Sequence, residues 1–288
     1  MDSTLTMQVD ELFLLVVRHV PQLLLVALVA FILTLFAKDI LNGLKRPFLN
    51  PDQWQPLPLV DKKVLTHNTR RFRFALPHSD QKLGLPIGQH VSLKVPDGTG
   101  AEVLRSYTPS SDIDQRGYVD FVIKIYPQGQ MTQQLDKLNI GDTVLFKGPK
   151  GRFKYQTNGK RALGMLAGGT GISPMYQVLQ AILKNPNDKT QLSLIFGNLT
   201  ADDILLKDEL DAMAAKFPQR VKVHYVLNTA PKGWTGGVGF ITEDMIRTYL
   251  PAPAPDVLIL RCGPPPMNKA MEVHLDALGY PKDCQFQF

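Results

Sequence analysis

The sequence is poor in the residues that build metal sites, disulfide frameworks and hydrolytic centres. Only two of its 288 residues are cysteines, Cys262 and Cys284, and its six histidines are scattered along the chain. Neither cysteine stands in a CxxC pair or beside paired histidines, which argues against a zinc site and for a reducing compartment. We also find no Ser/His/Asp set and no pair of carboxylates arranged for acid–base catalysis.

A strong charge of one sign is also absent. Lysine and arginine number 32 and aspartate and glutamate 26, so the formal net charge at pH 7 is +6. This mild, dispersed excess suits an acidic partner or a membrane surface. Because no basic block is interleaved with aromatics, it does not indicate nucleic-acid binding. The chain has no internal repeat and is long enough for two ordinary domains and an extension.

An apolar segment near the N-terminus predicts a membrane anchor. Its uncharged part, Val20–Ala37, has about 18 residues, which is the short end of what spans a bilayer. Acidic residues precede the segment and basic residues follow it, unlike a signal peptide, and this bias places the downstream domains in the cytosol. A buried core helix is the alternative. We expect an uncleaved anchor over residues 1–37 and a proline-rich tether over residues 38–56.

Residues 57–158 show the period-two alternation of half-buried strands. The clearest strand candidates are Phe72–Leu76, Val91–Val95, Val119–Ile125 and Val144–Phe146. Turn sequences separate them, among them Pro86-Ile87-Gly88 and Asp97-Gly98. A single helix is expected, around Met131–Leu138. Several short strands at this spacing predict an antiparallel β-barrel.

Residues 159–288 change to alternating strands and helices. The expected strands are Ala162–Ala167, Gln191–Gly197, Val221–Leu227 and Val257–Arg261. The expected helices are Ser173–Leu183, Asp202–Ala215, Thr242–Leu250 and Pro265–Leu278. Asp202 and Thr242 suit helix N-caps. This alternation predicts a parallel sheet that binds ligands at the carboxyl ends of its strands.

The sequence GGTGISP joins the first of these strands to the first helix. Its loop consists of Gly168, Gly169, Thr170 and Gly171. Ser173 fits an N-cap and Pro174 the first helical turn, so the junction would offer backbone N–H groups to a phosphate. A tight turn that needs glycine is the structural alternative. Because Pro174 stands where GxGxxG has its third glycine, this is not a standard dinucleotide fingerprint.

Two further motifs carry chemistry. In RSYTPS, Arg105 offers a planar fork for a phosphate, Tyr107 a ring for a flat heterocycle, and Ser106 and Thr108 hydroxyl groups. The alternative is an exposed, polar strand end. After the last main strand comes CGPPPM, in which the lone thiol of Cys262 is by itself best read as structural.

Together these motifs resemble those of the NADH–cytochrome b5 reductases, a family of the ferredoxin reductase superfamily, in its membrane-anchored fungal form. Four companion motifs narrow the resemblance: LPIGQHVSL (Leu85–Leu93), VDFVIKIY (Val119–Tyr126), GQMTQQL (Gly129–Leu135) and GPKGRFKY (Gly148–Tyr155). It extends from about Leu57 to Phe288. The resemblance implies a six-stranded FAD-binding β-barrel at 57–158, followed by an α/β, parallel-sheet NADH-binding domain at 159–288.

The resemblance also assigns residues of the barrel to FAD. Arg105 would pair with the pyrophosphate, Tyr107 and Thr108 would contact the isoalloxazine and ribityl chain, and Lys124 would border the flavin and help hold NADH. Gln130 stands where relatives often carry a lysine. The implied FAD-binding set is Arg105, Ser106, Tyr107, Thr108, Val122, Lys124, Tyr126, Gly129, Gln130, Met131 and Thr132.

In the second domain the resemblance places Thr170 and Cys262 beside the nicotinamide, with Cys262 as a positioning group and not a nucleophile. Asn228 occupies the position of an aspartate that disfavours NADPH in animal relatives, so we expect a less strict NADH preference. Ser173 would face the flavin and Phe288 would lie beside it. The remaining implied residues are Gly168, Gly169, Gly171, Pro174, Gly263, Pro264, Pro265 and Met267.

The implied reaction is hydride transfer from NADH to N5 of FAD, then two one-electron transfers to cytochrome b5, in support of sterol and lipid oxidation. Thr170, Cys262 and Lys124 would act at the reacting centre. We expect a monomer on the endoplasmic reticulum or mitochondrial outer membrane, with loose basic clusters that steer the acidic haem protein. The alternatives are another acceptor, such as an iron protein of diphthamide synthesis, and a membrane-tethered nucleotide sensor without turnover.

Overall fold

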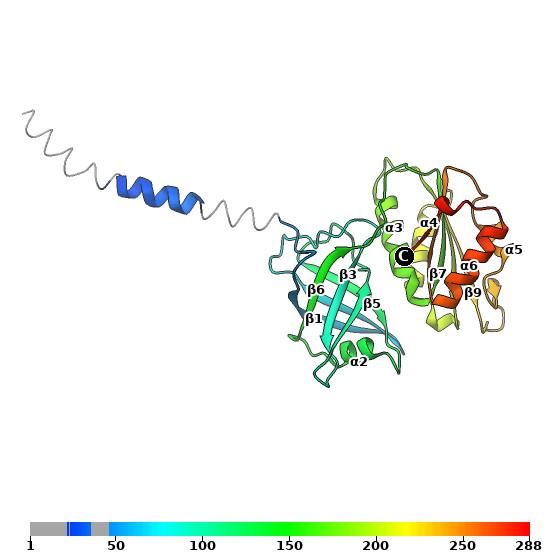
Figure 1. Cartoon of the computed structure of the whole chain (residues 1–288), viewed down its shortest axis with the longest axis horizontal. Coiled ribbons are helices and arrows are strands. Elements are labelled where there is room, and N and C mark those ends of the chain that lie inside the picture. Colours follow the sequence, from blue (N-terminus) through cyan, green and yellow to red (C-terminus); the bar gives the residue numbers. More distant parts are fainter. Residues whose placement is uncertain (1–21, 23, 36–45) are drawn as a thin grey trace, which may run out of the picture. The chain divides into compact units, whose positions relative to one another are not determined.

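The computed structural model describes residues 22, 24–35 and 46–288 (Figure 1). The chain separates into two compact units, Met1–Arg46 and Pro47–Phe288. Residues 24–35 of the first unit are helical and exposed. Within the described part of the chain, no helix is long and apolar enough to cross a membrane. Much of the predicted anchor at 1–37, and residues 38–45 of the predicted tether, lie outside the described residues.

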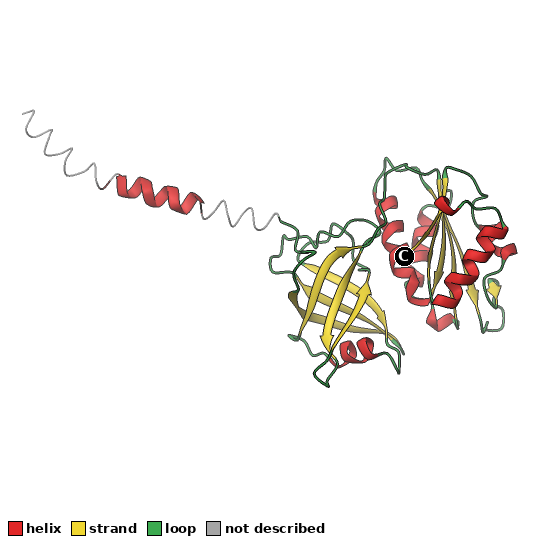
Figure 2. Ribbon diagram, in the orientation of Figure 1, coloured by secondary structure: helices red, strands yellow, loops and turns green. Residues whose placement is uncertain are grey.

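The second unit begins with a six-stranded antiparallel sheet, as predicted (Figure 2). Its strands are β1 (Gln55–Thr66), β2 (Thr69–Ala75), β3 (His90–Pro96), β4 (Glu102–Tyr107), β5 (Tyr118–Lys124) and β6 (Thr143–Lys150). They are hydrogen-bonded in the order β4-β3-β6-β1-β2-β5. The expected helix is α2 (Gln130–Lys137), which connects β5 to β6.

This first sheet curls into a barrel. Its edge strands are β4 and β5, which in a flat sheet would lie about 24 Å apart, since neighbouring strands are about 4.8 Å apart. Instead the rings of Tyr107 on β4 and Phe121 on β5 have their centroids 6.4 Å apart. The rings of Phe74 and Phe146 pack edge-on within the same core, with centroids 5.1 Å apart. The two edges therefore face each other around one apolar core.

The end of the predicted tether is part of this domain. Phe48 and Leu49 are 5% and 9% exposed and belong to the barrel core. Their backbone N–H groups donate to the carbonyls of Lys82 and Leu83. The predicted tether is therefore packed against the barrel at Phe48 and Leu49, because burial of these two apolar side chains is favourable.

The second sheet is parallel, as predicted, and helices cover both of its faces (Figure 1). Its strands are β7 (Ala162–Gly168), β8 (Gln191–Asn198), β9 (Val221–Leu227), β10 (Gly237–Val238), β11 (Val257–Cys262) and β12 (Gln285–Gln287), in the order β10-β9-β8-β7-β11-β12. The helices are α3 (Ile172–Lys184), α4 (Lys207–Lys216), α5 (Glu243–Tyr249) and α6 (Pro265–Ala277).

Strand β7 explains why helices cover both faces of the sheet. Every residue of β7 is buried, which requires cover on both faces. Met165 packs in the core that contains Leu179 of α3, whereas Leu166 packs in the core that contains Met271 of α6. Successive side chains of a strand point to opposite faces, so one apolar run supplies both cores.

One predicted helix is confirmed only in part, and its predicted cap is wrong. Of the predicted helix Asp202–Ala215, residues 207–215 lie in α4, whereas its start belongs to a short 3-10 turn, η2 (Ala201–Asp203). Residues 204–206 separate the two, and among them Leu206 has a left-handed backbone with φ of 58°. Thr200, not Asp202, caps η2, in a reciprocal capping box with Asp203. The other predicted cap is confirmed, since the Thr242 hydroxyl accepts a hydrogen bond from the N–H of Met245.

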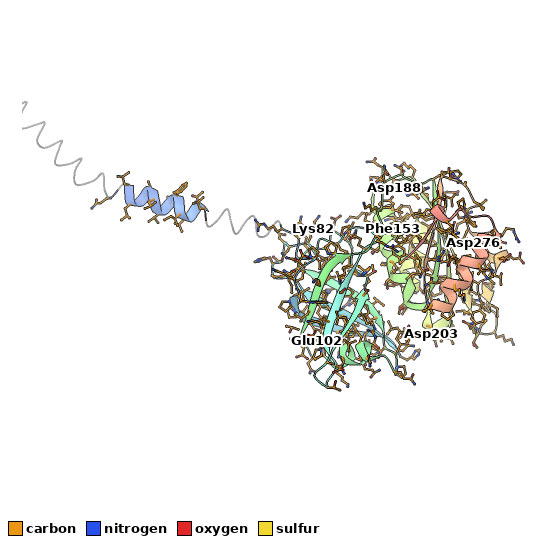
Figure 3. All side chains as sticks on the ribbon, in the orientation of Figure 1. Lys82, Glu102, Phe153, Asp188, Asp203 and Asp276 are labelled. Carbon is orange, nitrogen blue, oxygen red and sulfur yellow. The ribbon has the colours of Figure 1, made fainter. Side chains whose placement is uncertain are left out.

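Several contacts join the barrel to the α/β domain. The buried N–H of Gly88 donates to Oε1 of Gln177 on α3 over 2.7 Å. The ring of Phe153, which follows β6 in the chain, packs against those of Phe286 and Phe288 with centroids 5.1 and 5.4 Å apart. Figure 3 labels Phe153 where the two domains meet. The relative position of the domains is thus fixed by directional and apolar contacts together.

Gly88 offers a test of this junction. Its φ is +74°, and a Cβ there would lie 2.0 Å from Cδ1 of Phe153. Gly100 has φ of +97° with open space around it, so Gly100→Ala is a matched control for backbone strain alone. We expect Gly88→Ala to lower the free energy of unfolding by about 1–3 kcal/mol more than Gly100→Ala, the usual cost of overpacking. Chemical denaturation of both variants measures this difference, and equal losses would contradict the expectation.

Candidate functional site

A cleft of about 850 Å³ is lined by both domains. Strands β4 and β5 and the start of α2 form one wall, and the ends of β7 and β11 with the start of α3 form the other. The volume is in the upper range for small-molecule sites, and parallel sheets bind ligands at this end of their strands. The cleft collects all of the predicted site residues except Asn228, Pro265 and Met267.

On the barrel wall, Arg105 is exposed and carries a charge that no neighbouring acid balances. Its Nη1 donates to the carbonyl of Leu104 over 2.7 Å, and within residues 46–288 it forms no ion pair. Two residues further along β4, burial raises the pKa of Tyr107 to about 12, so this phenol remains a hydrogen-bond donor at neutral pH. Arg105 can therefore bind an anion, while Tyr107 offers an apolar ring with a polar tip.

Helix α2 begins at the cleft without a side-chain cap. Its N-cap is Gly129, where a Cβ would lie 2.4 Å from Oγ1 of Thr132. That hydroxyl accepts from the N–H of Tyr126 and donates to the carbonyl of Gly129, so it is engaged within the turn. The first N–H groups of α2 thus receive no side-chain oxygen and are available to an anion in the cleft.

Helix α3 begins at the opposite wall, also without a side-chain cap. Ser173 is not its N-cap, contrary to prediction: a 3-10 turn, η1 (Gly169–Gly171), leads directly into α3, and Gly171 takes the N-cap position. The structural reason is close packing, because a Cβ on Gly171 would lie 2.1 Å from the carbonyl oxygen of Cys262. Pro174 lies in the first helical turn, as predicted.

These features fit two phosphate-bearing cofactors. Two helix starts without side-chain caps and one unbalanced arginine meet at a single cleft, and each is a favourable anion site. The donor set contains no group of three or more His, Cys, Asp or Glu side chains suited to a metal in the described residues.

Cys262 borders the cleft at the end of β11 as a free thiol. Burial raises its pKa to about 11, so at neutral pH it is a thiol and not a thiolate. The thiolate is the nucleophilic form, and Cys262 is therefore poorly suited to covalent catalysis. A compact, polarisable side chain at this position can instead shape the surface that a ligand contacts.

Lys124 forms an ion pair that the sequence does not reveal. Its Nζ donates to Oδ1 of Asp203, in η2 of the other domain, over 2.5 Å. Both side chains are about nine-tenths buried. Burial by itself raises the pKa of Asp203, but hydrogen bonds from Lys124, Asn68 and Thr200 outweigh it and lower this pKa to about 2. The Asp203 carboxylate is therefore ionised at neutral pH.

Comparison with known proteins identifies the family. Residues 56–155 match the oxidoreductase FAD-binding domain, and residues 165–272 match the oxidoreductase NAD-binding domain. NADH–cytochrome b5 reductase 1 of Arabidopsis thaliana is 52% identical over 85% of this chain and 87% of its own. The enzyme of the same name from Meyerozyma guilliermondii is 50% identical over 91% and 93%. The chain belongs to the NADH–cytochrome b5 reductase family.

Solved structures agree with this family. The cytochrome b5 reductase domain of Ulva prolifera nitrate reductase superposes with a TM-score of 0.81 and 39% identity, over 84% of this chain and all of that one. The two-domain order of the fold, an antiparallel sheet followed by a parallel sheet, is thus that of the reductase family. FAD and NADH are its cofactors, because both binding domains are present in a chain so similar to these reductases.

Three predicted residues lie outside the lining of the cleft. Asn228 is exposed directly after β9, where its N–H donates to the carbonyl of Asn198. Met267 packs against the end of β7: a Cβ on Gly168 would lie 2.3 Å from its sulfur. Its side chain therefore supports the junction between β7 and α3. Pro265 is the first residue of α6 and is exposed.

Three lining residues were not predicted: His90, Ile123 and Gln128. His90 is the most informative, because burial and the charge of Lys150 lower its pKa and keep its ring neutral at pH 7. It stands inside LPIGQHVSL, so the family motif contained a signal for it. Ile123 and Gln128 carry no such signal. Ile123 fits the alternation of an ordinary strand, and Gln128 is an ordinary polar residue of a turn, so neither indicates a ligand site.

The raised pKa of Cys262 can be tested by alkylation. Iodoacetamide reacts with the thiolate, so at pH 8 we expect Cys262 in the folded protein to react at least about tenfold more slowly than in the unfolded protein. Peptide mass spectrometry distinguishes it from Cys284, and denatured protein is the control. Equal rates in both states would show that Cys262 is an ordinary exposed thiol.

Proposed function

We propose that this protein is an FAD-dependent NADH:cytochrome b5 oxidoreductase. Its membership of the reductase family supports this activity, and one structural observation in this chain supports it further. The observation is that two helix starts without side-chain caps, one from each domain, and the unbalanced Arg105 border a single cleft. Such a cleft can hold two phosphate-bearing cofactors side by side.

FAD supplies the chemistry that links the two partners, because it accepts a hydride from NADH and passes electrons on singly to a haem. The role of the chain is to hold the two cofactors in contact. On the barrel, Arg105 and the N–H groups at the start of α2 would bind the FAD pyrophosphate. The ring of Tyr107, which packs against Phe121, would contact the isoalloxazine of FAD.

The other wall would hold NADH. The backbone N–H groups at Gly169 and Gly171 lie at the start of α3 and suit its phosphates. Thr170 is exposed on this loop, and Cys262 lies across the junction as a neutral thiol, so both would orient the nicotinamide without reacting with it. Phe288, packed on Phe153, would close the cleft at the C-terminus of the chain.

The activity is tested with the purified protein loaded with FAD. Under anaerobic conditions NADH should bleach the flavin absorbance, and oxidised cytochrome b5 should then restore it. A protein that binds NADH without bleaching would be a nucleotide sensor and not a reductase. Bleaching by NADH that cytochrome b5 fails to reverse, while ferricyanide does so, would indicate a different acceptor.

Asn228 offers a test of cofactor preference. An aspartate there would place a carboxylate near the adenosine ribose, where it would repel the 2′-phosphate of NADPH. We expect Asn228→Asp to increase the ratio of kcat/KM for NADH over NADPH by about tenfold, which corresponds to about 1.4 kcal/mol. Asn187→Asp is the control, because Asn187 is exposed in the loop before β8, at the opposite end of the sheet. An unchanged ratio would place Asn228 away from the ribose.

The protein is further proposed to act as a monomer anchored by its N-terminal segment, with both domains in the cytosol on the endoplasmic reticulum or mitochondrial outer membrane. The apolar run of Val20–Ala37, with basic residues after it, supports this orientation. An anchor suits electron transfer because two proteins on one membrane meet at high effective concentration.

A further inference from the structure

We propose that Asp203 is a positioning residue, which holds Lys124 and thereby sets the spacing between the two walls of the cleft. This inference rests on the proposed function. It concerns how the chain holds the two cofactors close enough for hydride transfer. Figure 3 labels Asp203 where the α/β domain meets the barrel.

The carboxylate of Asp203 is fixed on its own domain. Oδ2 accepts from the N–H of Thr200 over 3.2 Å and from its hydroxyl over 2.9 Å. The bond from the Thr200 N–H belongs to the capping box in η2, and together the two bonds orient the carboxylate from within its own domain. Oδ1 is thereby left to face the other domain.

The barrel supplies two donors to Oδ1 from two separate segments. Lys124, at the end of β5, donates over 2.5 Å, and Nδ2 of Asn68, in the turn between β1 and β2, donates over 3.2 Å. One carboxylate therefore connects three segments that are distant in the sequence. Because Lys124 also lines the cleft, any displacement of this contact moves a wall of the site.

Burial distinguishes this contact from the other ion pair between the domains. Lys184 on α3 pairs with Asp112 and Asp114, but those side chains are 37–48% exposed. Exposed pairs of that kind contribute little. The side chains of Lys124 and Asp203 are 10% and 9% exposed, and removing one partner of such a pair leaves a buried charge without compensation.

The contact bears on the reaction through distance. Hydride transfer requires the donor and acceptor atoms to approach closely, and a misplacement of about 1 Å can cost two orders of magnitude in rate. The later transfer of electrons to an external acceptor does not require the α/β domain to hold NADH in place. Loss of Asp203 should therefore affect the first half of the catalytic cycle and spare the second.

The test uses Asp203→Asn in the FAD-loaded protein. Asp256→Asn is the control for the change of charge and side chain, because Asp256 forms an exposed ion pair with Arg161 of the same domain, away from the contact with the barrel. In anaerobic stopped-flow at saturating NADH, we expect flavin reduction to slow about tenfold in Asp203→Asn. Reoxidation of the reduced protein by ferricyanide should remain within about twofold of wild type, and the control should match wild type in both steps.

A second measurement uses the cofactor-free protein and does not depend on turnover. Hydrogen exchange should increase in Asp203→Asn at residues 66–69 of the barrel and at residues 199–206 of the α/β domain, and at neither segment in the control. If Asp203→Asn does not fold, Asn68→Ala removes the second donor to the same carboxylate and should change both readouts in the same direction.

Three outcomes would overturn the proposal: flavin reduction at the wild-type rate, equal slowing of both half-reactions, or faster exchange confined to residues 199–206. Failure of the proposed function is a separate result. In that case NADH would not bleach the wild-type flavin at all, while the exchange of the cofactor-free variants would still report on the contact.

Discussion

The structure depends on one constraint: two domains that fold around separate cores must keep two helix starts at one cleft. Each helix start by itself is a common anion site, and each domain supplies one of them to the cleft. The contacts that fix the domains are therefore as important for function as the residues that line the cleft. They include the buried bond from Gly88 to Gln177, the ring cluster around Phe153, and the ion pair of Lys124 with Asp203.

Close backbone packing at the α3 junction serves the same constraint. Gly171 lies against the carbonyl of Cys262, and Gly168 lies against the sulfur of Met267, so the junction of β7 with α3 packs directly on the end of β11 and the start of α6. The motifs GGTGISP and CGPPPM thus form one surface, although they are far apart in the sequence. This explains why N–H groups at the start of α3 and the neutral thiol of Cys262 border the same cleft.

Much of the fold could be predicted because its local signals agree with its tertiary packing. The apolar run of β7 is buried on both faces, and Thr242 caps α5, as the sequence indicates. Predictions failed where two local signals competed. Asp202 precedes an amphipathic run and suits an N-cap, but Thr200 takes the N-cap position of η2 and Asp203 is its partner in the capping box. Ser173 is not the predicted N-cap of α3, because the 3-10 turn η1 leads directly into the helix and places Gly171 at the N-cap.

The sequence by itself determined the order of the two domains, the periodicities of their strands and helices, and the motifs that place the chain in its family. These properties are local, since each depends on residues within a few positions of one another. Only the tertiary structure decided which side chains meet across the cleft. Lys124 and Asp203 are 79 positions apart, and no periodicity relates them. Their pairing follows from the way in which two separately folded surfaces come together.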